Sequence, residues 1–184
     1  MFRRLVAAFL LAAPVGAAVA QPNASGDWSV GAMPNGCMMQ ATSPEGTMLS
    51  VWGTAGDDKL GFLLQNKGWN ALRDGASYQL KLDFLGVSSL PVEATARQDI
   101  DSDGPGFYFQ LQPGGASGKA FMDAFSRAQG MRISQDGKSV DTLSLAGGQG
   151  AMSALARCLA QSWAEGDPAG DDEEPETAGV GASI

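Results

Sequence analysis

Hydrophobic and polar residues alternate along much of the chain before residue 112. The clearest case is the segment 78–84, where four apolar side chains alternate with Gln79, Lys81 and Asp83. Strict alternation is typical of a β-strand with one buried face and one solvent-exposed face. The same reading, with turn signals between segments, predicts strands at 28–30, 37–41, 47–54, 59–65, 78–84, 90–97, 107–111, 131–134 and 140–145.

The period changes to about 3.6 in two places, which predicts two helices. The first covers the apolar positions of 120–128, carries an i,i+4 pair of Asp123 and Arg127, and stops near Gly130. The second covers 147–165, and its apolar stripe is expected to lie on the core. The stripe consists of Met152, Leu155, Leu159 and Trp163. Trp28 and Trp52 are also expected in the core, whereas Trp69 falls in an irregular segment.

These elements predict an α+β fold. The body is a mostly antiparallel β-sheet, or a β-sandwich-like arrangement, of about seven to nine strands, with two helices in the C-terminal half. Residues 21–165 are expected to form one β-rich globular domain, since this length buries a sizeable core.

The first twenty residues have the pattern of a secretory signal peptide. Arg3 and Arg4 precede the apolar run Leu5–Ala13, and small residues end at a cleavage site after Ala20. The apolar run is too short to span a bilayer, and no later stretch is apolar enough to do so. An N-terminal anchor that is never cut is the alternative. The sequence therefore predicts a secreted or periplasmic bacterial protein without a membrane span after signal removal.

The chain has a net charge of −8 and is most acidic at its C-terminal end. Residues 166–184 are rich in Gly, Pro, Ala and acidic residues, and we expect them to form a disordered tail. From position 165 onward there is no basic residue and seven acidic ones: Glu165, Asp167, Asp171, Asp172, Glu173, Glu174 and Glu176. Nucleic-acid binding depends on neutralising phosphates, so this composition argues against a nucleic-acid partner.

Cys37 and Cys158 are the two cysteines of the chain. In an oxidising compartment, two cysteines without metal-site spacing are expected to form a disulfide. Closing a loop of about 120 residues removes roughly 5 kcal/mol of unfolded-chain entropy. Two free buried thiols are the alternative.

The chain contains no histidine. This excludes a Ser-His-Asp arrangement and the usual zinc sites, and it leaves a cysteine nucleophile without its commonest base. No complete catalytic motif is present, so we expect no enzymatic activity, no catalytic residues and no cofactor. A hydrolase or carbohydrate-active protein that uses paired carboxylates is the alternative.

The segment Asp99–Gly104 matches the first six positions of a calcium-binding loop. Asp99, Asp101 and Asp103 occupy the oxygen-ligand positions, and a glycine follows at the sixth. The rest of the segment departs from the calcium-loop pattern, because the twelfth position is Gln110, where a bidentate Glu is expected. The alternatives are a weak calcium site in a calcium-stabilised structural domain, or an acidic solvated loop.

The overall layout resembles the invasion-associated locus B family of exported bacterial proteins. The matching features are Gly26-Asp27-Trp28, Cys37 shortly after, the alternating β segments, and the closing run 140–147 with Ala151 beyond it. The resemblance implies a β-rich, non-catalytic envelope or secreted protein, linked in some pathogens to host-cell entry. The sequence thus favours a protein-interaction module that contacts an envelope or host protein; its oligomeric state is left open.

Overall fold

The computed structural model describes residues 28–98 and 104–166, and these form nine strands and two helices. Seven strands precede the first helix, α1 (Ala116–Arg127), in the chain. Two more strands follow α1, and the second helix, α2 (Gly148–Gly166), is the last described element. The strands are β1 (Ser29–Met33), β2 (Gly36–Thr42), β3 (Met48–Thr54), β4 (Leu60–Gln65), β5 (Ser77–Phe84), β6 (Ser88–Arg97), β7 (Gly106–Leu111), β8 (Gly130–Gln135) and β9 (Lys138–Ser144). The predicted α+β class, with both helices in the C-terminal half, is confirmed.

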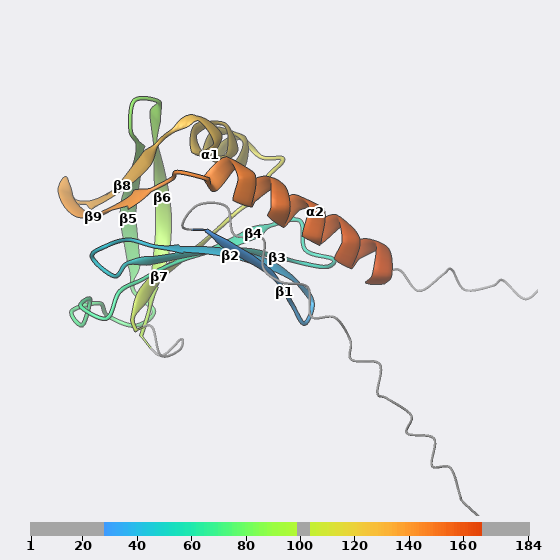
Figure 1. The fold of residues 1–184 in the computed structure, drawn as a ribbon. Helices are drawn as coiled ribbons and strands as arrows, with labels where there is room; N and C mark the ends of the chain where they lie inside the picture. The colour runs from blue at the N-terminus through green and yellow to red at the C-terminus, as the bar shows by residue number, and fades with distance from the viewer. Residues whose placement is uncertain (1–27, 99–103, 167–184) are drawn as a thin grey trace, which may run out of the picture.

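All nine strands belong to one curled antiparallel sheet rather than to two packed sheets (Figure 1). The strand order is β1-β2-β3-β4-β7-β6-β5-β8-β9. Most chain neighbours pair with each other, including the predicted β3–β4 and β8–β9 hairpins, whereas β4 does not pair with β5 and β7 does not pair with β8. Two pairings join distant parts of the chain, β4 with β7 and β5 with β8. These two pairings place the C-terminal half beside the N-terminal half.

The turn between β8 and β9 follows from its sequence. Asp136 and Gly137 both have positive φ, 51° and 74°. A two-residue hairpin loop with two positive φ angles twists in the same sense as its strands, and Asp-Gly adopts it at low cost. The predicted hairpin is therefore confirmed at the expected residues.

Pro91 lies inside β6, paired with Lys81 of β5. On its other side β6 pairs with β7 only through Thr95–Arg97. Among the described strands, β6 thus has a single partner at Pro91, so the missing N–H group does little harm to the sheet. This fits the expectation of a proline at an edge-like position.

Both helices lie over the inner face of the curled sheet, where the apolar side of each strand meets them (Figure 1). The α2 helix contacts β1, β2 and β3, and α1 contacts β6 and α2. Phe121 of α1 lies at the centre of this core, 1 % exposed. Its ring centroid is 4.7 Å from that of Phe62 and 5.4 Å from those of Phe84 and Phe125. Aromatic packing therefore joins β4, β5 and α1.

A polar contact joins the two ends of the curled sheet. The Ser43 hydroxyl, after β2, donates to the Asp141 carboxylate of β9 at 2.9 Å. The same oxygen accepts the backbone N–H of Thr47 at 3.1 Å. Ser43 is buried, and both of its hydrogen-bonding capacities have partners. The hydroxyl thus has a structural role in holding the β2–β3 turn against β9.

On the outer face, Trp52 of β3 lies across Gly61 of β4. The two residues are paired in register, and the indole stacks on Tyr108 with ring centroids 5.8 Å apart. Trp52 is half-buried there, so the expectation that it is a core residue is wrong. The reason is the two-residue strand period: Val51 and Gly53 face inward, which turns Trp52 outward.

We expect Gly61→Ala to destabilise the protein by about 1–3 kcal/mol, because a β-carbon there would lie 2.4 Å from the Trp52 ring and would force the indole off the sheet. Urea unfolding followed by far-UV circular dichroism measures the change. Gly31→Ala in β1 is the matched control, since no atom lies within 4 Å of its added carbon. Equal midpoints for the two variants would contradict the packing described.

Candidate functional site

Cys37 of β2 and Cys158 of α2 form the predicted disulfide, with their Cα atoms 6.0 Å apart. Cys37 is fully buried and Cys158 is half-buried. The Ser162 hydroxyl, one helical turn after Cys158, lies 3.5 Å from the Cys37 sulfur and donates to the Cys158 carbonyl at 3.1 Å. The disulfide therefore fixes the middle of α2 to β2.

The inner side of α2 approaches the sheet closely at Gly53 of β3. A β-carbon at Gly53 would lie 2.8 Å from a methyl group of Leu159, so glycine is needed for this approach. Leu155 and Leu159 are buried, as the apolar stripe predicts. They form the part of the stripe that rests on the core.

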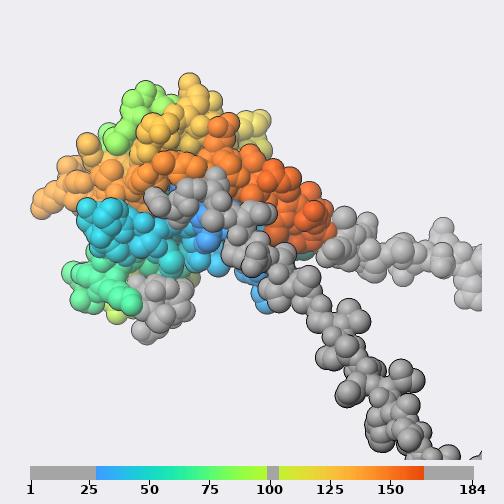
Figure 2. Space-filling view, viewed as in Figure 1, coloured from blue at the N-terminus to red at the C-terminus, as the bar shows by residue number. Residues whose placement is uncertain are grey.

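The two ends of the stripe differ from the prediction. Met152 is half-buried, and the Trp163 side chain is 48 % exposed. In Figure 1 the C-terminal part of α2 extends past the strands, and in Figure 2 it lies on the surface of the molecule. The expectation that Trp163 is a core residue is wrong, because the last turns of α2 have less of the sheet beneath them.

An apolar groove of about 240 Å³ opens beside this exposed part of α2. We call it the α2 groove. Its walls come from three places in the sequence: α2, the end of β3 with the β3–β4 turn and the start of β4, and the β7–α1 connection with α1. Its lining residues are Gly53, Asp57, Asp58, Lys59, Leu60, Pro113, Met122, Met152, Leu155, Ala156, Leu159 and Trp163. The volume is below that of a typical drug-sized pocket and is suited to one or a few side chains.

The polar part of the lining is the β3–β4 turn. Asp57 Oδ1 accepts the backbone N–H of Lys59 at 3.0 Å, which fixes the turn. Asp58 Oδ2 accepts a hydrogen bond from the Gln112 side chain, which ties the turn to the β7–α1 connection. All three charged residues of the turn are exposed. The groove thus combines an apolar floor with a charged rim.

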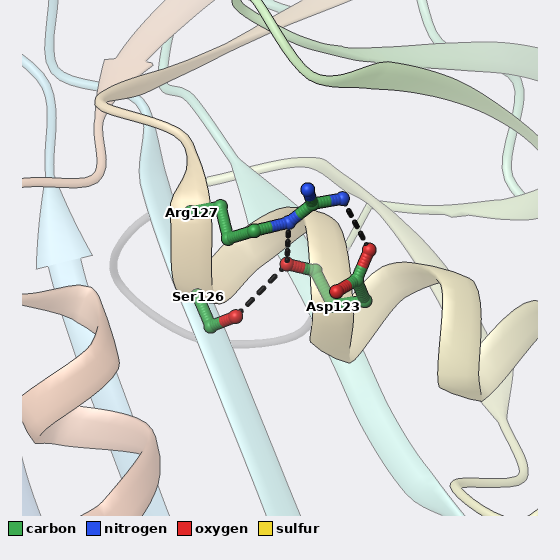
Figure 3. Close-up of polar contacts among 3 residues, drawn as sticks. All are labelled: Asp123, Ser126 and Arg127. Atoms are coloured by element: carbon green, nitrogen blue, oxygen red, sulfur yellow. Dashed lines mark hydrogen bonds and ion pairs between the residues drawn. The ribbon is translucent and has the colours of Figure 1, made fainter.

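The charges on the neighbouring helix α1 are on its exposed side. Arg127 hydrogen-bonds to both the carboxylate and the main-chain carbonyl of Asp123, and the Ser126 hydroxyl donates to that carbonyl (Figure 3). The predicted i,i+4 pair is confirmed, and neither charged residue lines the α2 groove. An exposed pair of this kind contributes only about 0.3–0.5 kcal/mol.

A second, more polar hollow of about 650 Å³ lies on the outer face of β5, β6, β8 and β9. Its charged lining residues are Lys81, Asp83, Arg132 and Asp136. Lys81 lies 2.8 Å from Asp83, and this hydrogen-bonded contact lowers the pKa of the Asp83 carboxyl below its usual value. A general acid for glycoside chemistry needs the opposite shift, a raised pKa. The arrangement at Asp83 therefore does not match that role.

The predicted calcium ligands Asp99, Asp101 and Asp103 lie outside the described residues. The two residues that follow them are described. Gly104 has a φ of 94°, its carbonyl accepts from the Gln65 side chain at 3.1 Å, and the Pro105 carbonyl accepts from the Asn66 N–H at 3.1 Å. Within 28–98 and 104–166 no group of three or more Cys, Asp or Glu side chains is placed to hold a metal ion. The calcium hypothesis stays a prediction, as do the signal peptide and the disordered tail. The signal peptide and the tail from residue 167 also fall outside the described residues, whereas Gly166, the first residue of the predicted tail, ends α2.

Comparisons with known proteins identify no relative of this chain. No family model, no curated protein and no solved structure matches the chain. In the part of the chain that the structure describes, no helix is both long enough and apolar enough to cross a membrane. The resemblance to the invasion-associated locus B family therefore stays a prediction.

The α2 groove is the feature that sequence reasoning missed. Its members are spread over more than a hundred residues, and no local motif joins Leu60, Met122 and Trp163. One signal was present in the sequence: the apolar stripe of α2 continues to Trp163, two residues before the acidic segment that begins at Glu165. An apolar residue at the very end of an amphipathic helix is a reason to expect an exposed apolar surface.

Proposed function

We propose that this protein is an exported, non-catalytic binding module, and that the α2 groove holds apolar side chains of a partner protein. The observation that carries the proposal is the exposed Trp163 beside an apolar groove that two methionines also line. Tryptophan and methionine are enriched at protein interfaces, and an exposed apolar patch commonly marks an interaction site.

The composition of the groove supports binding of side chains rather than catalysis. Met122 and Met152 have flexible, polarizable side chains that adapt to differently shaped apolar groups. One oxygen of each rim carboxylate has a structural hydrogen bond, that of Asp57 with the Lys59 backbone and that of Asp58 with the Gln112 side chain. Such an arrangement stabilises the shape of the rim and provides no nucleophile with an adjacent base.

The proposed location rests on the sequence and is compatible with the structure. The signal-like segment 1–20 predicts export, and the disulfide between Cys37 and Cys158 is typical of an oxidising compartment. An envelope or host protein, as the family resemblance implies, remains the proposed source of the partner.

We expect Ala156→Arg to weaken binding of a short apolar peptide at least tenfold, or about 1.4 kcal/mol, because the new side chain would occupy the α2 groove. Ala156 lines the groove and is exposed, so the substitution leaves the core intact. The probe is a fluorescein-labelled peptide with a Leu-Leu-Phe centre and glutamine flanks, and the measurement is fluorescence anisotropy.

Ala160→Arg is the matched control. Ala160 is also an exposed alanine of α2, but it does not line the groove. The control variant should bind like the unmodified protein. Equal affinities of all three proteins, or no binding to any apolar peptide, would overturn the proposed site.

A further inference from the structure

We infer that the partner segment held in the α2 groove is cationic, with an apolar anchor side chain flanked by lysine or arginine. This inference rests on the proposed function and adds the chemistry of the partner. Its evidence is the distribution of charge around the exposed end of the groove, which three observations describe.

The first observation is the charge of the rim. Asp57 and Asp58 are exposed beside the apolar floor, and Lys59 is the one base among the lining residues. The carboxylates keep lone pairs for a further donor, because each accepts one hydrogen bond from the described residues and a carboxylate has about four acceptor sites. A lysine or arginine of a partner would therefore find acceptors at the edge of the groove.

The second observation is the orientation of α2. Its C-terminal end lies next to Trp163, where the last carbonyl groups of a helix have no partners within the helix. The aligned peptide dipoles place about half a negative charge at this end. No basic residue lies in the last turn of α2 to neutralise it. A cation supplied by a partner would be stabilised at this position.

The third observation is the sequence that follows α2. Asp167 directly follows the last residue of α2 and is four positions after Trp163 in the sequence. Five more acidic residues follow between 171 and 176, and no basic residue follows at all. Among its charged residues, the sequence after α2 therefore contains only acidic ones.

These charges disfavour two other occupants. The chain's own C-terminal segment, 167–184, would bring its acidic residues to an acidic rim. A second copy would bring the same rim, the same helix end and a net charge of −8. Juxtaposed like charges weaken association, whereas complementary charges speed and direct it. A cationic partner is the occupant that the charge distribution favours.

The test compares three labelled peptides that share the Leu-Leu-Phe centre and differ only in their flanks: lysine, glutamine or glutamate. We expect the lysine peptide to bind about tenfold more tightly than the glutamate peptide at an ionic strength of about 0.01 M, and the ratio to shrink at about 0.15 M, where exposed charges are screened. In the double variant Asp57→Asn and Asp58→Asn the ratio should fall about threefold. Asparagine retains the acceptor oxygens that hold the turn.

The control is the double variant Asp74→Asn and Asp136→Asn, which removes two exposed carboxylates that do not line the groove. It should leave the ratio unchanged. A glutamate peptide that binds as tightly as the lysine peptide, or a ratio that both double variants reduce equally, would overturn the inference and leave the proposed function standing. Sedimentation would also overturn the inference if it showed dimers that Ala156→Arg abolishes and Ala160→Arg preserves. That result would assign the groove to a second copy of the chain. If no peptide of any charge binds, the proposed function itself is wrong.

Discussion

Replacing Cys37 and Cys158 together by alanine is expected to lower the free energy of unfolding by about 5 kcal/mol. The disulfide joins residues 121 positions apart, so its removal frees nearly the whole described chain in the unfolded state. The loss is comparable to the total stability of many domains, which is about 5–15 kcal/mol. Urea unfolding of the oxidised protein and of the double variant measures it.

The double variant also provides the control for reduction. A thiol reductant should lower the urea midpoint of the unmodified protein and should leave that of the variant unchanged, because the variant has no cysteine. Alanine is preferable to serine at position 37, where the side chain is fully buried and a hydroxyl would lose hydrogen bonds to water. A loss below about 1 kcal/mol would contradict the role assigned to this bond.

The second large effect is expected at the centre of the core. Phe121→Ala should lower the free energy of unfolding by about 3–5 kcal/mol, because it removes a fully buried ring and leaves a cavity between β4, β5 and α1. Urea unfolding followed by far-UV circular dichroism gives the value. The effect should be largely independent of the state of the disulfide, since the rings that pack on Phe121 belong to β4, β5 and α1, whereas the two cysteines belong to β2 and α2.

Met122→Ala is the comparison for this prediction. Met122 is the next residue of the same helix, but it is only half-buried and lines the α2 groove. Its removal should cost about 1 kcal/mol, the ordinary size for a partly exposed side chain. Equal costs for the two variants would show that Phe121 is not the centre of the core.

The disulfide and the α2 groove are linked through one helix. Cys158 lies between Leu155 and Leu159, which line the groove, and Ala156 is two residues before it. The same bond that stabilises the fold therefore fixes the wall of the proposed binding site. On this account a reductant should weaken peptide binding as well as stability.

The local elements were predictable because their signals are local. The alternation of 78–84 indicates β5, and Asp136-Gly137 indicates the β8–β9 turn, since each depends on only a few neighbouring residues. The two cysteines likewise left one possible pairing within the chain. In such cases the chemistry of the residues restricts the structure strongly.

The strand order was not predictable in the same way. The pairing of β4 with β7 brings Phe62 opposite Phe109, and that of β5 with β8 brings Leu82 opposite Ile133. Nothing in either strand indicates its distant partner, because most apolar strands present similar faces to one another. The same limit applies to the α2 groove, whose walls meet only after these pairings are made.

Trp163 illustrates a different limit. The spacing of an apolar stripe shows which side of a helix faces the core, but it does not show how far the sheet extends beneath the helix. Leu155 and Leu159 are buried as expected, whereas Trp163, one turn later, is 48 % exposed. Trp163, on which the functional proposal rests, is therefore the residue at which the apolar stripe of α2 continues past the edge of the sheet.

The central claim is that a partner's side chains enter the α2 groove beside Trp163. The most direct test follows the indole N–H signals of the four tryptophans in ¹H–¹⁵N NMR spectra while the lysine-flanked peptide is added. Trp163→Phe identifies the signal of Trp163, and the buried Trp28 serves as the internal reference. We predict that the Trp163 signal shifts with the binding curve while the Trp28 signal stays in place. A Trp163 signal that does not move at saturating peptide would contradict the account.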